Sequence, residues 1–211
     1  GRDFYRSLSS SKIMNKKYKL NYFSTQVHCI KNIIENKKDI CQRTFSQDKN
    51  KIFQDIKNFS NSDIVVLKTK WYPETLEKLD ETISFLLKNN KKIFLVSDFP
   101  TFNINKLKYN PPLNFNKNFQ QKIFFQRSLP LERFILENNR FPEGNELRKI
   151  KKVYYSLINS SAVENNKLLV QKAKKFDIEY LDHFNLICDT KKKSCLISTT
   201  DNKIIHRDGA G

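Results

Sequence analysis

Three short apolar segments, separated by helical patterns, constrain the fold of this chain more than any other feature. Asp63-Ile-Val-Val-Leu67 and Lys92-Ile-Phe-Leu-Val96 each follow a polar turn, and Ile178-Glu-Tyr-Leu181 repeats the pattern later. Runs of this length and composition are typical of buried parallel strands. Residues 73–87 lie between the first two runs and carry leucines at helical spacing, with Pro73 suited to a first helical turn. The alternation predicts an α/β fold with a mainly parallel sheet and right-handed crossovers.

The second half of the chain is expected to be largely helical before the third strand. Helical patterns cover about 129–139, 145–158 and 161–176, after a long stretch at 101–127 that is rich in Asn, Pro and Phe and lacks clear periodicity. Ligands of parallel sheets bind beyond the carboxyl ends of the strands. The loops after Leu67 and Val96 and the segment that carries Asp208 are therefore expected to share one rim.

Length and composition indicate one globular domain over residues 1–211. The chain has 38% hydrophobic and 12% aromatic residues, which is enough for a packed core and argues against global disorder. No run approaches the roughly 18 apolar residues of a membrane-spanning helix. No segment is predicted to cross a membrane within these residues.

The formal charge of +17 admits two interpretations. A nucleic-acid or anionic-membrane surface would explain it, and so would an A/T-rich coding sequence that favours lysine. A dedicated binding stripe concentrates its cations, whereas the lysine clusters here are spread along the chain, at 16–17, 37–38, 91–92, 151–152 and 191–193. We therefore favour solvated lysines and expect no nucleic-acid partner.

The four cysteines fall into two local pairs. Cys29 and Cys41 are 12 residues apart, and Cys188 and Cys195 are 7 apart. Neither spacing, with the nearby histidines, completes a zinc pattern, so no metal site is expected. The pairs favour two disulfides formed in an oxidising compartment, and the alternative is four buried free thiols in a cytosolic protein.

Several segments, in order, resemble the SGNH hydrolase family. Gly1-Arg-Asp-Phe-Tyr-Arg-Ser-Leu8 resembles the helix after the family's Gly-Asp/Asn-Ser-His nucleophile block. Asp63 to Trp71 resembles the strand with a trailing Trp found in one SGNH branch, and Ser97-Asp-Phe-Pro100 resembles the exit of its next strand. The cysteine pair Cys188/Cys195 followed by Asp208 resembles its C-terminal block. That branch is fused to membrane acyltransferases of the acyltransferase-3 family, which O-acetylate cell-surface glycans.

The resemblance implies a three-layer α/β/α, flavodoxin-like fold and a Ser-His-Asp triad. Asp208 would orient the histidine, and the block order places the serine upstream of Gly1 and the histidine beyond Gly211. We therefore expect residues 1–211 to be one SGNH-like domain truncated at both ends, and inactive as such. Trp71 takes the place of the Asn that donates a hydrogen bond to the oxyanion in the family, with Thr69 nearby. Trp71, Thr69 and Arg2 are the substrate-binding candidates.

Each of these residues also has an ordinary structural interpretation. Asp208 precedes a glycine and suits a turn, and Trp71 suits the core as well as a sugar face. His183 follows Asp182 at a strand exit and could act as a base, although a surface histidine is the simpler interpretation. His206 is expected to be structural.

The leading hypothesis is acyl transfer, with O-acetyl as the expected group, to cell-envelope carbohydrate, or hydrolysis of such esters, without a cofactor. The expected partners are a cell-surface glycan and an integral-membrane acyltransferase domain of the same polypeptide. The expected location is periplasmic or otherwise extracytoplasmic, tethered to the inner membrane. One alternative is a non-catalytic carbohydrate-binding domain that assists a membrane acyltransferase. The other is a basic nucleic-acid-binding protein.

Overall fold

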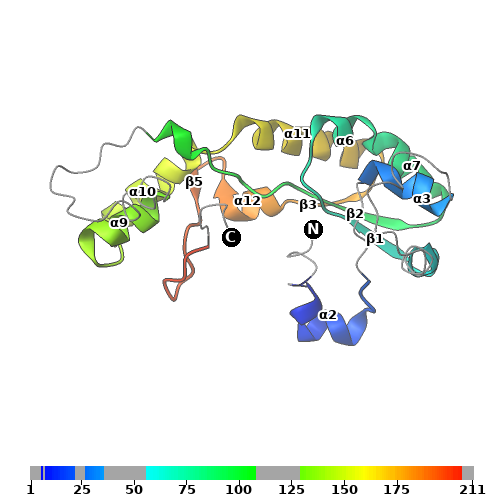
Figure 1. Ribbon diagram of the computed structural model, residues 1–211, viewed down its shortest axis with the longest axis horizontal. Coiled ribbons are helices and arrows are strands. Elements are labelled where there is room, and N and C mark those ends of the chain that lie inside the picture. Colours follow the sequence, from blue (N-terminus) through cyan, green and yellow to red (C-terminus); the bar gives the residue numbers. More distant parts are fainter. Residues whose placement is uncertain (1–5, 7, 22–26, 36–55, 108–128, 206–211) are drawn as a thin grey trace, which may run out of the picture. The chain divides into compact units, whose positions relative to one another are not determined.

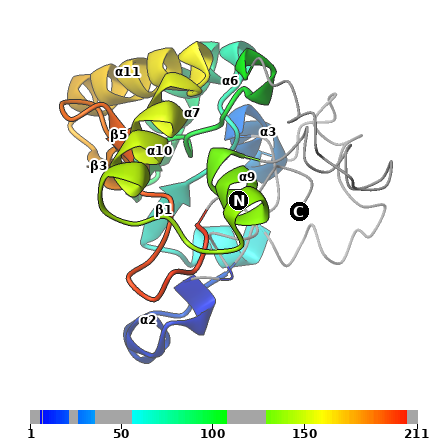
Figure 2. The same cartoon turned by 90° about the vertical axis from the view of Figure 1, so that its left-hand side faces the viewer.

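The computed structural model describes residues 6, 8–21, 27–35, 56–107 and 129–205 (Figures 1 and 2). The chain groups into two compact units. Unit 1 comprises residues 1–98 and 164–182, and unit 2 comprises residues 99–163 and 183–211. The prediction of one domain over 1–211 stays a prediction.

Unit 1 is built on a three-stranded parallel sheet in the order β1-β2-β3. The strands are β1 (Ile64–Leu67), β2 (Lys92–Val96) and β3 (Glu179–Leu181). Val65 pairs with Ile93 in the first ladder, and Leu95 pairs with Tyr180 in the second. The predicted apolar runs therefore form the strands, and the α/β class with a parallel sheet is confirmed.

Helices connect and cover the strands on one face of the sheet. The crossover from β1 to β2 consists of α6 (Pro73–Glu77) and α7 (Leu79–Lys88), and α11 (Ser160–Lys175) precedes β3. Pro73 occupies the first turn of α6, where its missing N–H is not needed. Smaller elements of the same unit are α2 (Lys12–Lys17), η1 (Val27–Cys29) and α3 (Ile30–Ile34), and residues 56–60 are also helical.

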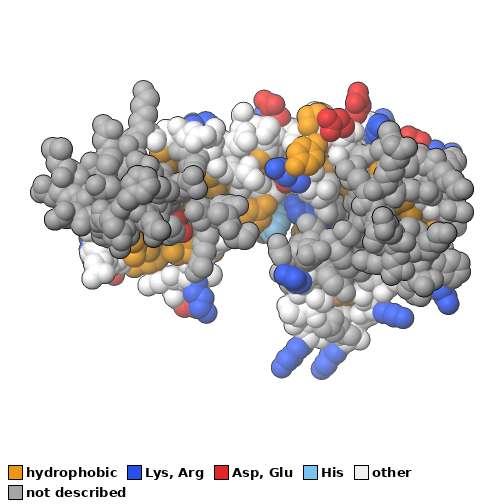
Figure 3. All heavy atoms as spheres, viewed as in Figure 1, with side chains coloured by type: hydrophobic (Ala, Val, Ile, Leu, Met, Phe, Trp, Pro, Cys, Tyr) orange, Lys and Arg blue, Asp and Glu red, His pale blue; other side chains and the backbone are white. Residues whose placement is uncertain are grey.

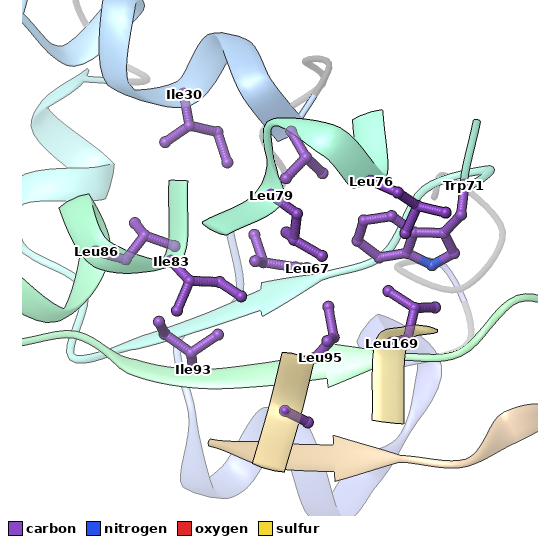
Figure 4. Packing of buried hydrophobic residues seen from close by; sticks show 12 residues of the cluster. Ile30, Leu67, Trp71, Leu76, Leu79, Ile83, Leu86, Ile93, Leu95 and Leu169 are labelled. Atoms are coloured by element: carbon purple, nitrogen blue, oxygen red, sulfur yellow. The ribbon is translucent and has the colours of Figure 1, made fainter. Parts of the chain in front are cut away.

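The core of unit 1 lies between these helices and the covered face of the sheet. Its buried members include Leu67, Ile93 and Leu95 from the strands, and helical residues pack on them (Figure 4). Those labelled from the helices are Ile30, Leu76, Leu79, Ile83, Leu86 and Leu169. Leu79, Ile83, Leu86, Leu95 and Leu169 are fully buried. Of the apolar residues predicted to share one face of 73–87, Leu76, Leu79, Ile83 and Leu86 form the packing face of α6 and α7, whereas Leu87 is 38% exposed.

The opposite face of the sheet is much less covered. Ile64 and Val66 of β1 have exposed fractions of 37% and 43%, and Leu181 of β3 is 41% exposed. Parallel sheets are usually covered by helices on both faces. The described residues thus show one complete helical layer on the sheet. The predicted three-layer α/β/α arrangement stays a prediction.

Unit 2 combines helices with a short hairpin. Its elements are η2 (Ile104–Lys106), α9 (Pro130–Asn138), α10 (Gly144–Ser156), α12 (His183–Ile187), β4 (Cys188–Asp189) and β5 (Ser194–Cys195). β4 and β5 are antiparallel, and Cys188 pairs with Cys195 in register. Gly144 has φ +49°, a left-handed conformation that glycine adopts without strain. Buried Leu131, Tyr154 and Ile197 form part of the unit's own core.

Candidate functional site

The candidate site is the carboxyl edge of the sheet in unit 1. Lys68 and Thr69 follow β1, Ser97 and Asp98 follow β2, and Asp182 follows β3. Because β1 and β2 are parallel neighbours, the carboxyl ends of both strands lie at the same edge, as predicted. Ligands of open α/β sheets bind beyond this edge, so its side chains are the candidates for ligand contact.

Trp71 is buried at this edge and bonded to the backbone. Its exposed fraction is 2%, and its indole Nε1–H donates to the Val96 carbonyl oxygen at 3.0 Å. The Asn165 side-chain Nδ2 donates to the Trp71 carbonyl oxygen at 2.6 Å. Three segments of unit 1 therefore meet at Trp71. This arrangement favours the packing alternative, since a substrate contact would require the indole to leave its place in the core.

Thr69 is half-buried and only weakly engaged. Its hydroxyl lies 3.5 Å from the Lys70 carbonyl oxygen, at the outer limit of a hydrogen bond. Thr69 therefore stays a candidate for substrate contact, because its hydroxyl has little intramolecular bonding to lose.

Lys68 is the cation of this edge, and the sequence analysis did not single it out. Its ammonium donates to the Ser97 carbonyl oxygen and thus joins the exits of β1 and β2. Burial lowers the pKa of Lys68, and the nearby Asp98 carboxylate partly opposes that effect. A half-buried ammonium beside a carboxylate can orient a polar or anionic group more strongly than a solvated lysine can.

Asn166 and Tyr180 bring two further polar groups to the same edge. The Asn166 Oδ1 accepts from the Asp98 backbone N–H at 2.8 Å, whereas its buried Nδ2 has no hydrogen-bond partner among the described residues. Burial raises the pKa of Tyr180 far above its ordinary value, and the Asp182 carboxylate adds to the effect. The buried Tyr180 hydroxyl makes no hydrogen bond of good geometry in the described part. The neighbouring Ser97 side chain interacts with it weakly.

A sequence signal for Asn166 existed. Ala162, Leu169 and Ala173 are buried along α11, at successive spacings of seven and four residues. Asn166 falls in that stripe and is itself only 8% exposed. A polar residue in an apolar helical stripe usually serves a specific hydrogen bond. The sequence carries no such signal for Lys68 and Tyr180. Lys68 directly follows a predicted strand and Tyr180 lies within one, and both positions are ordinary for these residue types.

The described edge carries polar side chains that can bind and orient a group. Its polar side chains are Lys68, Thr69, Ser97, Asp98, Asn166, Tyr180 and Asp182. Within the described ranges, no cluster of three or more His, Cys, Asp or Glu side chains could hold a metal ion.

The predicted cysteine pair of unit 2 is confirmed. Cys188 and Cys195 form a disulfide across the β4–β5 ladder, and both are buried. Cys29 is also buried, and neither it nor the other described cysteines are free thiols. Cys41, the partner predicted for Cys29, lies outside the described residues.

Of the remaining candidates, only His183 lies within the described ranges. Asp208, Arg2 and His206 lie outside them, so their roles stay predictions. His183 is the first residue of α12, and its ring meets the Phe99 ring edge-on, with 5.2 Å between centroids. This contact favours a packed histidine over the catalytic base considered for it.

Unit 2 also has a shallow hollow beside α9 and α10. Its volume is about 200 Å³, and its lining includes Phe134, Ile150 and Val153 with Arg133 and Glu137. Sites for small molecules usually enclose roughly 300–1,000 Å³. The hollow is therefore not assigned as a ligand site.

In the part of the chain that the structure describes, no helix has the length and apolar character needed to cross a membrane. Comparisons with protein-family models, curated proteins and solved structures found no match for this chain.

Proposed function

We propose that this chain forms an SGNH-type domain that handles acyl, chiefly O-acetyl, esters of cell-envelope carbohydrate. The observation that carries the proposal is the order of its segments along a parallel sheet. The Trp-bearing exit of β1 is followed by the Ser97-Asp98 exit of β2, and the Cys188–Cys195 hairpin precedes Asp208 in sequence. The same order underlies the resemblance to the SGNH family. In this proposal the fold is a three-layer flavodoxin-like domain.

The chemistry proposed is that of a Ser-His-Asp triad. A serine hydroxyl attacks the ester carbonyl, and a histidine takes the hydroxyl proton and returns it to the leaving alcohol. Water or a sugar hydroxyl then attacks the acyl-enzyme, which gives hydrolysis or transfer respectively. Asp208 orients the histidine and stabilises its charged form. The order of the family's blocks would place the serine before Gly1 and the histidine after Gly211.

The described edge of the sheet would support substrate rather than react with it. Lys68 and Trp71 fix the backbone of the β1 exit against β2. The Thr69 hydroxyl at this exit is only weakly bonded within the protein, and it would contact the carbohydrate. An extracytoplasmic location agrees with the Cys188–Cys195 disulfide, since disulfides persist in oxidising compartments. An integral-membrane acyltransferase domain of the same polypeptide would supply the acyl group.

The test compares ester hydrolysis by residues 1–211 with hydrolysis by a longer chain that includes the natural flanking sequence. With p-nitrophenyl acetate, the shorter chain should stay at background and the longer one should release p-nitrophenol. In the longer chain, Asp208→Asn should lower kcat by about 10³–10⁴-fold, because the histidine loses its orienting carboxylate.

Asp201→Asn is the matched control. Asp201 lies on an exposed turn with Lys203 2.8 Å away, so its loss should leave hydrolysis unchanged. Equal rates in the short and long chains, or an Asp208→Asn variant as active as the parent, would refute the triad. Binding of envelope glycan without hydrolysis by the longer chain would instead identify the non-catalytic carbohydrate-binding alternative.

A further inference from the structure

The exposed basic segment around α2 is the feature that the proposed function leaves unused. α2 begins after Ser11, whose Oγ accepts from the Met14 backbone N–H at 3.4 Å, and it ends at Tyr18. Lys16 and Lys17 occupy its last turn, where cations complement the helix dipole. The six-residue helix is thus well terminated at both ends, and its Lys12, Ile13, Lys16 and Lys17 side chains are exposed.

Four lysines of this segment carry a net positive charge that no local acid reduces. Lys12, Lys16, Lys17 and Lys19 are all exposed. The sequence contains no Asp or Glu from Phe4 to Ile34. In Figure 3 the region of α2, at the bottom of the view, shows Lys and Arg side chains in blue and no Asp or Glu in red. Elsewhere in unit 1, Lys31 and Lys172 pair with Glu81 and Asp80.

An apolar side chain stands among these cations. Ile13 is 78% exposed, more than any other large hydrophobic residue in the described part of the chain. Lys16 and Lys17 lie three and four residues after it, so on a helix they flank it on the same side. Tyr18 is 39% exposed, and the Lys17 ammonium lies over its ring, 5.4 Å from the ring centroid. Solvent exposure of Ile13 is unfavourable, and a contact that buries it would be favoured.

We propose that residues 12–20 bind the surface of an anionic lipid bilayer. The lysine ammonium groups lie at the level of the lipid phosphates, and Ile13 enters the boundary between headgroups and acyl chains. Tyr18 suits the same depth, because its ring is apolar and its hydroxyl is polar. One short helix gives reversible, salt-sensitive attachment rather than permanent insertion. This surface does not depend on the ester chemistry proposed above.

A bilayer fits this surface better than a nucleic acid does. Lysines can bind the phosphates of either a bilayer or a nucleic acid. A nucleic-acid duplex, however, has no apolar layer in which Ile13 could be buried. The segment also lacks arginine between Lys12 and Leu20, although arginine is the preferred residue for bidentate contacts to bases and phosphates. Ile13 is therefore the residue that distinguishes the two partners.

The test is flotation of the 211-residue chain with vesicles of phosphatidylcholine alone, or of phosphatidylcholine with about 30% phosphatidylglycerol, at about 0.1 M salt. The chain should bind only the anionic vesicles. Lys12→Gln/Lys16→Gln/Lys17→Gln should weaken binding by about 100-fold, since each ammonium contributes about fivefold near such a surface. Ile13→Ser should weaken it by about fivefold, through lost apolar burial.

Two matched controls separate this segment from the general charge of the chain. Lys191→Gln/Lys192→Gln/Lys193→Gln removes the same charge from another exposed site. Leu186→Ser removes a comparable apolar group that is 67% exposed. Both should bind as the parent does, and circular dichroism should show every variant folded. Equal weakening by the control triple, or parent-like binding by the α2 triple, would overturn the proposal. So would tighter, α2-dependent binding to a DNA duplex at the same salt.

Discussion

The two units of the chain are stabilised by different interactions. In unit 1, the sheet joins residues 64–67, 92–96 and 179–181, which are distant in sequence, and apolar burial stabilises it. In unit 2, β4 and β5 are close in sequence, and a covalent bond joins Cys188 to Cys195. The comparison teaches that unit 1 depends on packing against one face of its sheet, whereas part of unit 2 depends on an oxidised cysteine pair.

The largest expected effect is a cavity in the core of unit 1. Leu95→Ala should lower the free energy of unfolding by about 2–5 kcal/mol, because Leu95 is fully buried between the sheet and its helices. Trp71 is the single tryptophan of the chain and is buried in this unit. Its fluorescence during urea denaturation therefore reports unit 1 specifically.

Leu181→Ala is the control for Leu95→Ala, since it makes the same truncation on the less covered face. Leu181 is 41% exposed, so its loss should cost within about 0.5 kcal/mol. Comparable losses for the two variants would show that both faces of the sheet are packed, and the contrast between the faces would then fail.

The next effect concerns the hairpin of unit 2. Cys188→Ala/Cys195→Ala should lower its stability by about 2–3 kcal/mol, because the disulfide restricts a short loop in the unfolded chain. Hydrogen exchange of α10 amides would measure this loss, since α10 packs against β5. An unchanged Trp71 transition would show that the units unfold separately, and a common shift would show that they unfold together. Unaltered α10 exchange would contradict a stabilising role for the disulfide.

The smallest effect compares one buried tyrosine in each unit. Burial raises the pKa of Tyr154 in unit 2 and of Tyr180 in unit 1 far above the ordinary value. Each hydroxyl has one polar neighbour, the Leu131 backbone N–H for Tyr154 and the Ser97 side chain for Tyr180. Tyr154→Phe and Tyr180→Phe should therefore each change the free energy of unfolding by about 1 kcal/mol or less at neutral pH. Urea denaturation monitored by circular dichroism would measure both, and a clearly larger loss in either variant would contradict this expectation.

The same tyrosines fix the sign of the alkaline response. Because their folded pKa values lie above the unfolded value, their contribution is complete below about pH 10 and is lost as the unfolded phenol ionises above it. Lys68 acts in the opposite direction and at lower pH. Burial lowers its folded pKa, so stability rises as the pH increases from that lowered pKa to the unfolded lysine value. Each Tyr→Phe variant should therefore lose less stability between neutral pH and about pH 11 than the parent. Equal losses in variant and parent would contradict this sign.

The sequence predicted the strands well because each is a local apolar run. Residues 92–96 form β2 as expected, and the predictions for 63–67 and 178–181 each differ from the strand by one residue. The polar side chains at the carboxyl edge of the sheet could not be predicted in the same way. Lys68 and Asn166 are 98 positions apart in sequence. Only folding brings them to the end of β2, where Lys68 bonds to Ser97 and Asn166 bonds to Asp98. Asp208 was chosen through resemblance alone, so its role awaits the kinetic test.

The partly open face of the sheet has a consequence for behaviour in concentrated solution. β1 and β3 are the outer strands of the described sheet, and Val66 and Leu181 expose apolar surface on them. Outer strands with apolar faces promote edge-to-edge association. The net charge of +17 opposes it, because like-charged molecules repel at long range. The abundant lysines thus act as a colloidal stabiliser, and high salt, which shortens the screening length to about 3 Å at 1 M, removes that protection.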